Sequence, residues 1–102
     1  MNEEVNIKKY TIKTTSVFRK QYKKCIKQGK DKKKLYKIIE TLSSGESLEQ
    51  KYKDHMLINN RHYNNCRECH IEPDWLLIYK IEQDQLVLLL FEIGSHSELF
   101  SK

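Results

Sequence analysis

Apolar residues recur at helical spacing in two stretches of the first half of the chain. Each stretch repeats in steps of three and four residues, which gives a helix one apolar face. Gly29 is placed to end the first helix, Asp31 to cap the second and Gly45 to end it. The pattern therefore predicts a hairpin of two helices. Its apolar positions are Phe18, Tyr22, Cys25 and Ile26, followed by Leu35, Ile38, Ile39 and Leu42.

Elsewhere the pattern favours strands. Residues 10–14 alternate polar and apolar side chains, as a strand with one buried face does. Residues 64–71, 75–82 and 86–91 are predicted to be three further strands, and the middle one is a nearly continuous apolar run typical of a central strand. These elements predict an α+β fold in one domain over residues 1–102, with the helical hairpin packed on an antiparallel meander.

The last segment predicts a short helix. Ser95 followed three residues later by Glu98 is a capping box, so the helix should begin at His96. Because His96 and Phe100 are four residues apart, they would share one face of this helix.

Charge is distributed unevenly along the chain. The formal net charge is +5, and residues 1–51 carry 14 Lys and Arg against 6 Asp and Glu. A basic half is typical of a protein that binds nucleic-acid phosphates, although an AT-rich genome would also enrich lysine. The longest apolar run, at residues 86–91, is too short to cross a membrane, and the N-terminus shows no signal-peptide pattern. We therefore expect a cytoplasmic protein with no membrane partner.

The chain contains the groups needed to cleave RNA without a metal. Cleavage requires a base for the 2′-hydroxyl, an acid for the departing 5′-oxygen, and positive charge or hydrogen-bond donors near the phosphate. Histidine suits proton transfer near neutral pH, and aromatic rings can hold unstacked bases. Each residue also has a simpler interpretation: a structural histidine, a turn aspartate at position 74, or a core tryptophan at position 75. The four histidines are His55, His62, His70 and His96.

The cysteines invite a different interpretation. Residues 66–70 match the C-x-x-C-H pattern of c-type haem attachment, but this chemistry requires export, which we do not expect here. A zinc site would need a second ligand pair, and strand alternation would separate Cys66 from Cys69. We therefore expect reduced cysteines, no metal and no cofactor.

Three motifs in the second half resemble those of YafQ-type toxins in the RelE/ParE superfamily. They occupy residues 52–55, 67–80 and 94–100, and the similarity extends over about residues 10–100. The resemblance implies a metal-free endoribonuclease that enters the A site of the small ribosomal subunit and cuts the mRNA there. It also implies a partner antitoxin of the RelB/DinJ kind, through which alone the toxin would contact operator DNA.

The resemblance also assigns candidate site residues. As a hypothesis for their roles, His96 would be the general acid, either Asp74 or His70 the base, and His55 would steady the phosphate or tune its neighbours. The matched catalytic set is His55, His70, Asp74 and His96, and the candidate RNA-contacting residues are Trp75, Phe100, Lys53 and Arg67.

Two features depart from the family pattern. Glu92 stands where relatives often carry Arg, so a cation near the phosphate is missing and activity or substrate preference would differ. The stretch 56–66 is slightly longer than usual, and Met56 stands where proline is common. Arg61 or His62 on this loop would compensate for the missing cation, whereas the simpler interpretation is a solvated loop. Arg67 is a weaker candidate because strand alternation points it away from His70.

The basic helices would serve either the ribosome or the antitoxin. Lysines can hold ribosomal RNA phosphates, and an antitoxin could lay an amphipathic helix on the same surface. Two other functions compete: a gyrase poison of the ParE branch, which lacks the His/Asp set, and an inactive binding module, which only Glu92 favours. The lysines are Lys20, Lys23, Lys24, Lys27, Lys32, Lys33, Lys34 and Lys37.

Overall fold

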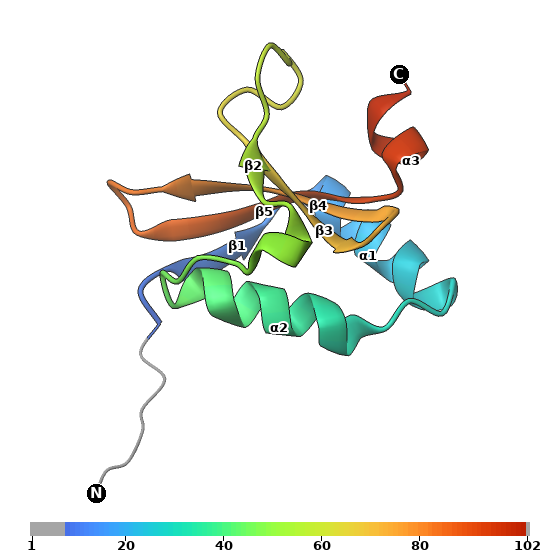
Figure 1. Ribbon diagram of the computed structural model, residues 1–102, viewed down its shortest axis with the longest axis horizontal. Coiled ribbons are helices and arrows are strands. Elements are labelled where there is room, and N and C mark those ends of the chain that lie inside the picture. Colours follow the sequence, from blue (N-terminus) through green and yellow to red (C-terminus); the bar gives the residue numbers. More distant parts are fainter. Residues whose placement is uncertain (1–7, 102) are drawn as a thin grey trace, which may run out of the picture.

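A computed structural model of the chain describes residues 8–101 (Figure 1). The expectation about a signal peptide concerns the first residues, most of which lie outside this part. The elements in chain order are β1 (Thr11–Thr14), α1 (Ser16–Lys27), α2 (Lys32–Ser43), the 3₁₀ turn η1 (Gln50–Tyr52), β2 (His55–Met56), β3 (Arg67–Glu72), β4 (Trp75–Glu82), β5 (Val87–Gly94) and α3 (His96–Phe100).

The five strands form one sheet in the order β1-β5-β4-β3-β2. The meander β3–β4–β5 is antiparallel, as predicted, whereas β1 pairs with β5 in parallel, a pairing that the sequence pattern does not reveal. Figure 1 shows α1 and α2 on one side of the sheet, with α3 and the loop that follows β2 on the other. The sheet is therefore covered on both faces. The cover by the two helices was predicted, whereas the cover by α3 and the loop that follows β2 was not.

The predicted helical hairpin is confirmed, together with the Asp31 cap and the two glycines that follow the helices; the cap at Thr15 was not predicted. The Thr15 hydroxyl accepts from the Phe18 backbone N–H at 2.9 Å, and the Asp31 carboxylate accepts from that of Lys33 at 3.0 Å. Gly29 and Gly45 follow the two helices with φ of 87° and 83°, a left-handed conformation that glycine adopts at low cost.

The boundaries of β3 and β5 differ from the prediction, and one strand is additional. The strand predicted from residue 64 begins only at Arg67, because the Cys66 N–H bonds the Tyr63 carbonyl at 3.1 Å and closes a turn there. The last strand continues past residue 91 to Gly94, and the two-residue β2 was not predicted. Loop 57–66 thereby folds back over the sheet instead of extending it.

The sheet separates two apolar clusters. The larger lies between the sheet and the helices α1 and α2, and includes Phe18, Leu35, Ile38, Leu77 and Leu88. The smaller lies on the opposite face, where Tyr63 and Cys66 of loop 57–66 and Leu99 of α3 cover Leu76 and Ile78 of β4. Strand β4 is thus buried on both faces, as its apolar run predicted. Within residues 8–101, every helix is too short or too polar to span a lipid bilayer.

The three cysteines are free and buried, and we predict that they are unreactive in the native protein. Burial raises the pKa of the Cys25, Cys66 and Cys69 thiols, and the thiolate is the form that reacts. At pH 8 a thiol-specific reagent should label none of them within the time that it takes to label all three in denaturant. Rapid labelling of the folded protein would contradict this packing.

Candidate active site

The face of the sheet opposite α1 and α2 carries the polar residues of interest. Directly opposed residues on neighbouring strands point to the same face, so they form rows across the sheet. Here two successive rows contain the candidate histidines of the strands. One row consists of His55, Glu68, Ile78 and Glu92, and the next consists of His70, Leu76 and Gly94.

Glu68 joins two of the predicted catalytic histidines. Its Oε1 lies 3.3 Å from Nε2 of His55 and 3.5 Å from Nε2 of His70, and Glu68 is only 6% exposed. On the other side of the His55 ring, Nδ1 lies 2.7 Å from the Lys53 carbonyl, which can only accept. Lys53 itself has a left-handed backbone, with φ of 50°, at the end of η1. The carboxylate and the carbonyl together fix the orientation of His55.

Glu68 was not among the predicted site residues. Residue 68 entered the sequence pattern only as part of the motif at residues 67–80. A signal was available, since a residue two positions before His70 in a strand must share its face. What the sequence could not reveal is that β2 places His55 opposite Glu68.

Asp74 and His96 form a second contact at the end of the sheet. Asp74, in the turn between β3 and β4, accepts from the backbone N–H of His96 at 2.9 Å. The predicted capping box of α3 is present: the Ser95 hydroxyl accepts from the Glu98 N–H, and the Glu98 carboxylate accepts from the Ser95 N–H. The rings of His96 and Phe100 are 5.0 Å apart, so the predicted shared face is confirmed.

His70 and His96 lie at the two ends of one row. His70 opposes Leu76, Leu76 opposes Gly94, and His96 follows Gly94 by two residues. Glu68 and Asp74 thus anchor the histidines at opposite ends of the same surface, while the His55 and His96 side chains stay exposed.

Glu92, which stands where relatives often carry Arg, is buried on this face of the sheet. It is 4% exposed, and its carboxylate accepts from Gln21 Nε2 at 3.1 Å and from the Tyr63 hydroxyl at 3.2 Å. Its other oxygen lies 2.9 Å from Nε2 of His62. Burial and the neighbouring carboxylate raise the pKa of Tyr63 well above its ordinary value, so Tyr63 remains a donor.

The expectation of a merely solvated loop holds for exposed residues such as Ile58 and Arg61 but not for Tyr63 and Cys66. Tyr63 and Cys66 of loop 57–66 are buried against the sheet, and the Tyr63 hydroxyl also donates to the Leu99 carbonyl at 2.9 Å. The Tyr63 ring lies 5.4 Å from the Phe100 ring and 4.5 Å from that of His62. The loop is packed because it provides the apolar cover of the sheet on this side.

Two candidate RNA contacts need correction. Trp75 is 1% exposed, and its Nε1 donates to Cys25 Sγ at 3.3 Å in the core beneath α1, so its ring has no face open to a base. Arg67 points to the helix side of the sheet, as strand alternation indicated, where it bonds Asp54 at 3.1 Å. Its guanidinium is thus already paired, away from His70.

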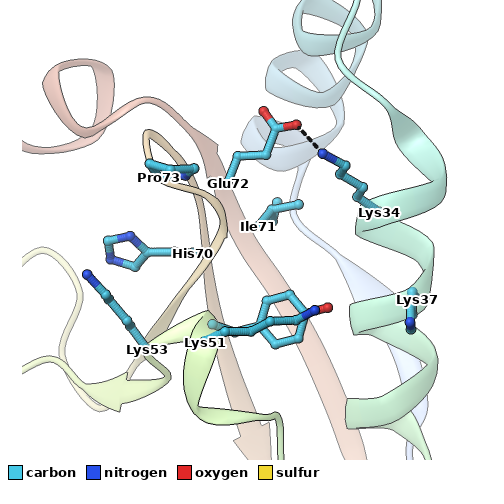
Figure 2. A pocket seen from close by; sticks show the side chains of 9 residues that line it. Lys34, Lys37, Lys51, Lys53, His70, Ile71, Glu72 and Pro73 are labelled. Carbon is cyan, nitrogen blue, oxygen red and sulfur yellow. Dashed lines mark hydrogen bonds and ion pairs between the residues drawn. The ribbon is translucent and has the colours of Figure 1, made fainter.

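Lys53 lies beside His70 at a basic groove. The groove has a volume of about 500 Å³, and Figure 2 shows His70 and Lys53 along one side of it, with Lys34 bonded to Glu72 across from them. This arrangement places Lys53 next to His70, while the charge of Lys34 across the groove is balanced by Glu72. The groove is lined by Lys34, Lys37, Lys51, Tyr52, Lys53, His70, Ile71, Glu72 and Pro73.

Comparison with known proteins agrees with this fold. A family model described as "Bacterial toxin of type II toxin-antitoxin system, YafQ" matches residues 10–101. The mRNA interferase toxin YafQ of Escherichia coli BL21 is 37% identical over 91 residues, which cover 87% of this chain and 94% of that protein.

Solved structures show the same similarity. A metal-bound toxin from Helicobacter pylori is 44% identical and superimposes with a TM-score of 0.83 over 89% of this chain and 99% of that one. The toxin of the E. coli DinJ–YafQ toxin–antitoxin complex is 32% identical, with a TM-score of 0.80 over 90% of this chain and 98% of that one.

A bacterial toxin of a type II toxin–antitoxin system is the class that the matched model and the fold define. Within this class, the chain belongs to the YafQ family. It is accordingly an endoribonuclease of the mRNA interferase kind, as the sequence resemblance implied. Residues 8–101 contain no group of three His, Cys, Asp or Glu placed to hold a metal ion. Metal-free catalysis stays a prediction.

Glu68→Gln should reduce RNA cleavage roughly 100-fold, because His55 and His70 would lose the carboxylate that orients them. The substitution keeps the shape of the side chain, so the melting temperature should change little. Cleavage rates of both proteins on one mRNA measure the effect. Glu82→Gln, at the far end of β4, is the matched control, and an equal loss in both variants would disprove the role of Glu68.

The start of α3 should respond to acid. Hydrogen bonds from Ser95 and the Lys24 ammonium hold the pKa of Glu98 below its ordinary value. Its stabilising effect is therefore complete above the unfolded-state pKa and is lost as the pH falls through the lower, folded value. In an NMR titration, the Ser95 amide should shift with a midpoint below about 4.3, the unperturbed glutamate value. The same titration of Glu98→Gln should show no such step, and a midpoint above 4.3 in the wild type would contradict the capping geometry.

Proposed function

We propose that this toxin cleaves mRNA on the ribosome by metal-free acid–base catalysis, with His55, His70, Asp74 and His96 as the catalytic set. The observation that carries the proposal is the placement of these residues along one face of the sheet. Two of them share Glu68, and the other two are joined by a hydrogen bond.

The proposed reaction is transesterification within the RNA. A base removes the proton of the 2′-hydroxyl, and the 2′-oxygen attacks the adjacent phosphorus. The bond from phosphorus to the 5′-oxygen breaks, and an acid gives that oxygen a proton. The products are a 2′,3′-cyclic phosphate and a free 5′-hydroxyl, so neither water nor a metal takes part in the cleavage step.

The geometry supports particular roles within this scheme. His96 is exposed at the first position of α3, where Asp74 fixes its backbone, and this favours His96 as the general acid. Since one oxygen of Asp74 is engaged in that bond, Asp74 is better suited to position His96. His70, with Glu68 beside its Nε2, is then the better candidate for the base.

His55 is suited to place positive charge near the phosphate, although neither ring nitrogen is left free to donate to it. Both of its ring nitrogens face acceptors, the Lys53 carbonyl and the Glu68 carboxylate, and both bonds are satisfied when the ring carries two protons. Such a ring brings positive charge to the site. Lys53 would add a second cation from the edge of the groove, and Phe100, which is partly buried beside His96, would offer its ring to a base.

The proposed partners follow from charge and from the relatives. The basic helices would contact ribosomal RNA around the A site of the small ribosomal subunit. Two of their lysines, Lys24 and Lys34, are already paired with Glu98 and Glu72. A relative forms the DinJ–YafQ toxin–antitoxin complex, and we propose an antitoxin of that RelB/DinJ kind for this chain. Contact with operator DNA would then occur only through the antitoxin, in the cytoplasm.

His96→Ala should lower the cleavage rate about 10²–10⁴-fold, because the leaving 5′-oxygen would lose its acid. Asp74→Asn should cause a smaller loss, since the amide oxygen can still accept from His96. Primer extension on a reporter mRNA in a translating extract measures both. Asp84→Asn, in the exposed turn between β4 and β5, is the control for the aspartate substitution and should cut as the wild type does.

Each result has a distinct meaning. Cuts that require the ribosome and vanish in His96→Ala support the proposal. Cuts that persist in His96→Ala would remove this residue from the catalytic set. A folded wild-type protein that cuts nothing would favour the inactive antitoxin-binding module, and inhibition of gyrase supercoiling would favour the ParE-like alternative.

A further inference from the structure

Glu92 is a third carboxylate in contact with a histidine on this face of the sheet, outside the proposed catalytic set. Three side chains surround its buried carboxylate: Gln21 and Tyr63 donate to Oε1, and His62 approaches Oε2. A buried carboxylate is tolerated when such partners compensate for its lost hydration. The contact is therefore built into the fold and is not a chance pairing at the surface.

His62 is held on one side and open on the other. Its Nε2 lies 2.9 Å from Glu92, and its ring packs edge-on against Tyr63 with centroids 4.5 Å apart. Even so, 56% of its side chain is exposed, and Nδ1 has no hydrogen-bond partner within residues 8–101. A ring that is oriented by a carboxylate through one nitrogen presents the other nitrogen to a ligand.

The position of Glu92 connects His62 to the proposed site. Glu92 and Glu68 oppose Ile78 from either side, so the carboxylate under His62 lies in the same row as the carboxylate that holds His55. From His62, the rings of Tyr63 and Phe100 lead in contact to His96. His62 thus stands on the same face as the other three histidines, beyond the aromatic cluster from His96.

We propose that His62, held by Glu92, binds a phosphate of the mRNA next to the one that is cleaved. This inference rests on the proposed function and extends its substrate site. A ring that donates to the carboxylate and to a phosphate oxygen carries two protons, and each nitrogen then forms a charge-assisted hydrogen bond. Arg61 is the adjacent cation on the loop, but no hydrogen bond or ion pair orients its side chain within residues 8–101.

The competing explanation is that His62 only fastens loop 57–66 to the sheet. The substitution His62→Gln separates the two explanations, because glutamine keeps a donor for Glu92 but removes the second nitrogen and the charge. His62→Arg restores a cation. Asn64→Ala changes an exposed side chain two residues further along the same loop and serves as the control.

The test compares these variants with the wild type in the translating extract, at several salt concentrations and with melting temperatures recorded. We expect His62→Gln to raise KM roughly tenfold at unchanged kcat. The slope of log(kcat/KM) against log[KCl] should become shallower by about 0.7, the value for one contact to a single-stranded phosphate. His62→Arg should recover most of both, and Asn64→Ala should match the wild type.

A His62→Gln protein that is as active as the wild type, with the same salt slope, would overturn the inference and leave His62 as a loop fastener. The inference would also be overturned if His62→Arg recovered neither KM nor the salt slope. A wild type that cuts no RNA would instead refute the proposed function. In that case the inference is decided by the affinity of wild type and His62→Gln for a single-stranded RNA oligonucleotide, measured at several salt concentrations. Equal slopes of log affinity against log[KCl] in the two proteins would overturn it.

Discussion

The burial of two carboxylates in one row of the sheet is the constraint on which the catalytic face depends. Glu68 and Glu92 are almost fully enclosed, and each requires donors in place of water. Histidines supply part of that need: His55 and His70 at Glu68, and His62 at Glu92. The same contacts that make these carboxylates tolerable also orient the imidazole rings that we assign to RNA binding and catalysis.

A second layer completes the face from outside the sheet. Loop 57–66 and α3 each bring one large residue over β4, and they meet where the Tyr63 hydroxyl donates to the Leu99 carbonyl. Helix α3 has only five residues, too few to be stable alone, so its position depends on the capping box and on Asp74. The position of His96 therefore depends in part on Asp74 in the β3–β4 turn, which is distant from His96 in sequence.

Much of this arrangement could be predicted from the sequence. Local patterns identified both long helices, the Asp31 cap of the second, the central strand and the capped start of α3, because neighbouring residues determine these features. The parallel pairing of β1, the short β2 and the folded loop 57–66 depend on contacts between distant residues, and no local pattern encodes them. The same limit explains the site: the motifs identified the histidines, and a core position was already the simpler interpretation of Trp75, whereas the contacts that Glu68 and Glu92 make with histidines of other segments depend on the folded structure.

The most direct test of this account is to observe the histidine rings themselves. Long-range ¹H–¹⁵N NMR spectra report which ring nitrogen carries a proton, so Nδ1 of His55 and Nε2 of His62 should be protonated and protected from exchange. Glu68→Gln should shift the signals of His55 and His70 alone, and Glu92→Gln those of His62 alone. Rings in rapid tautomeric exchange, unaffected by either substitution, would show that the buried carboxylates do not organise this face.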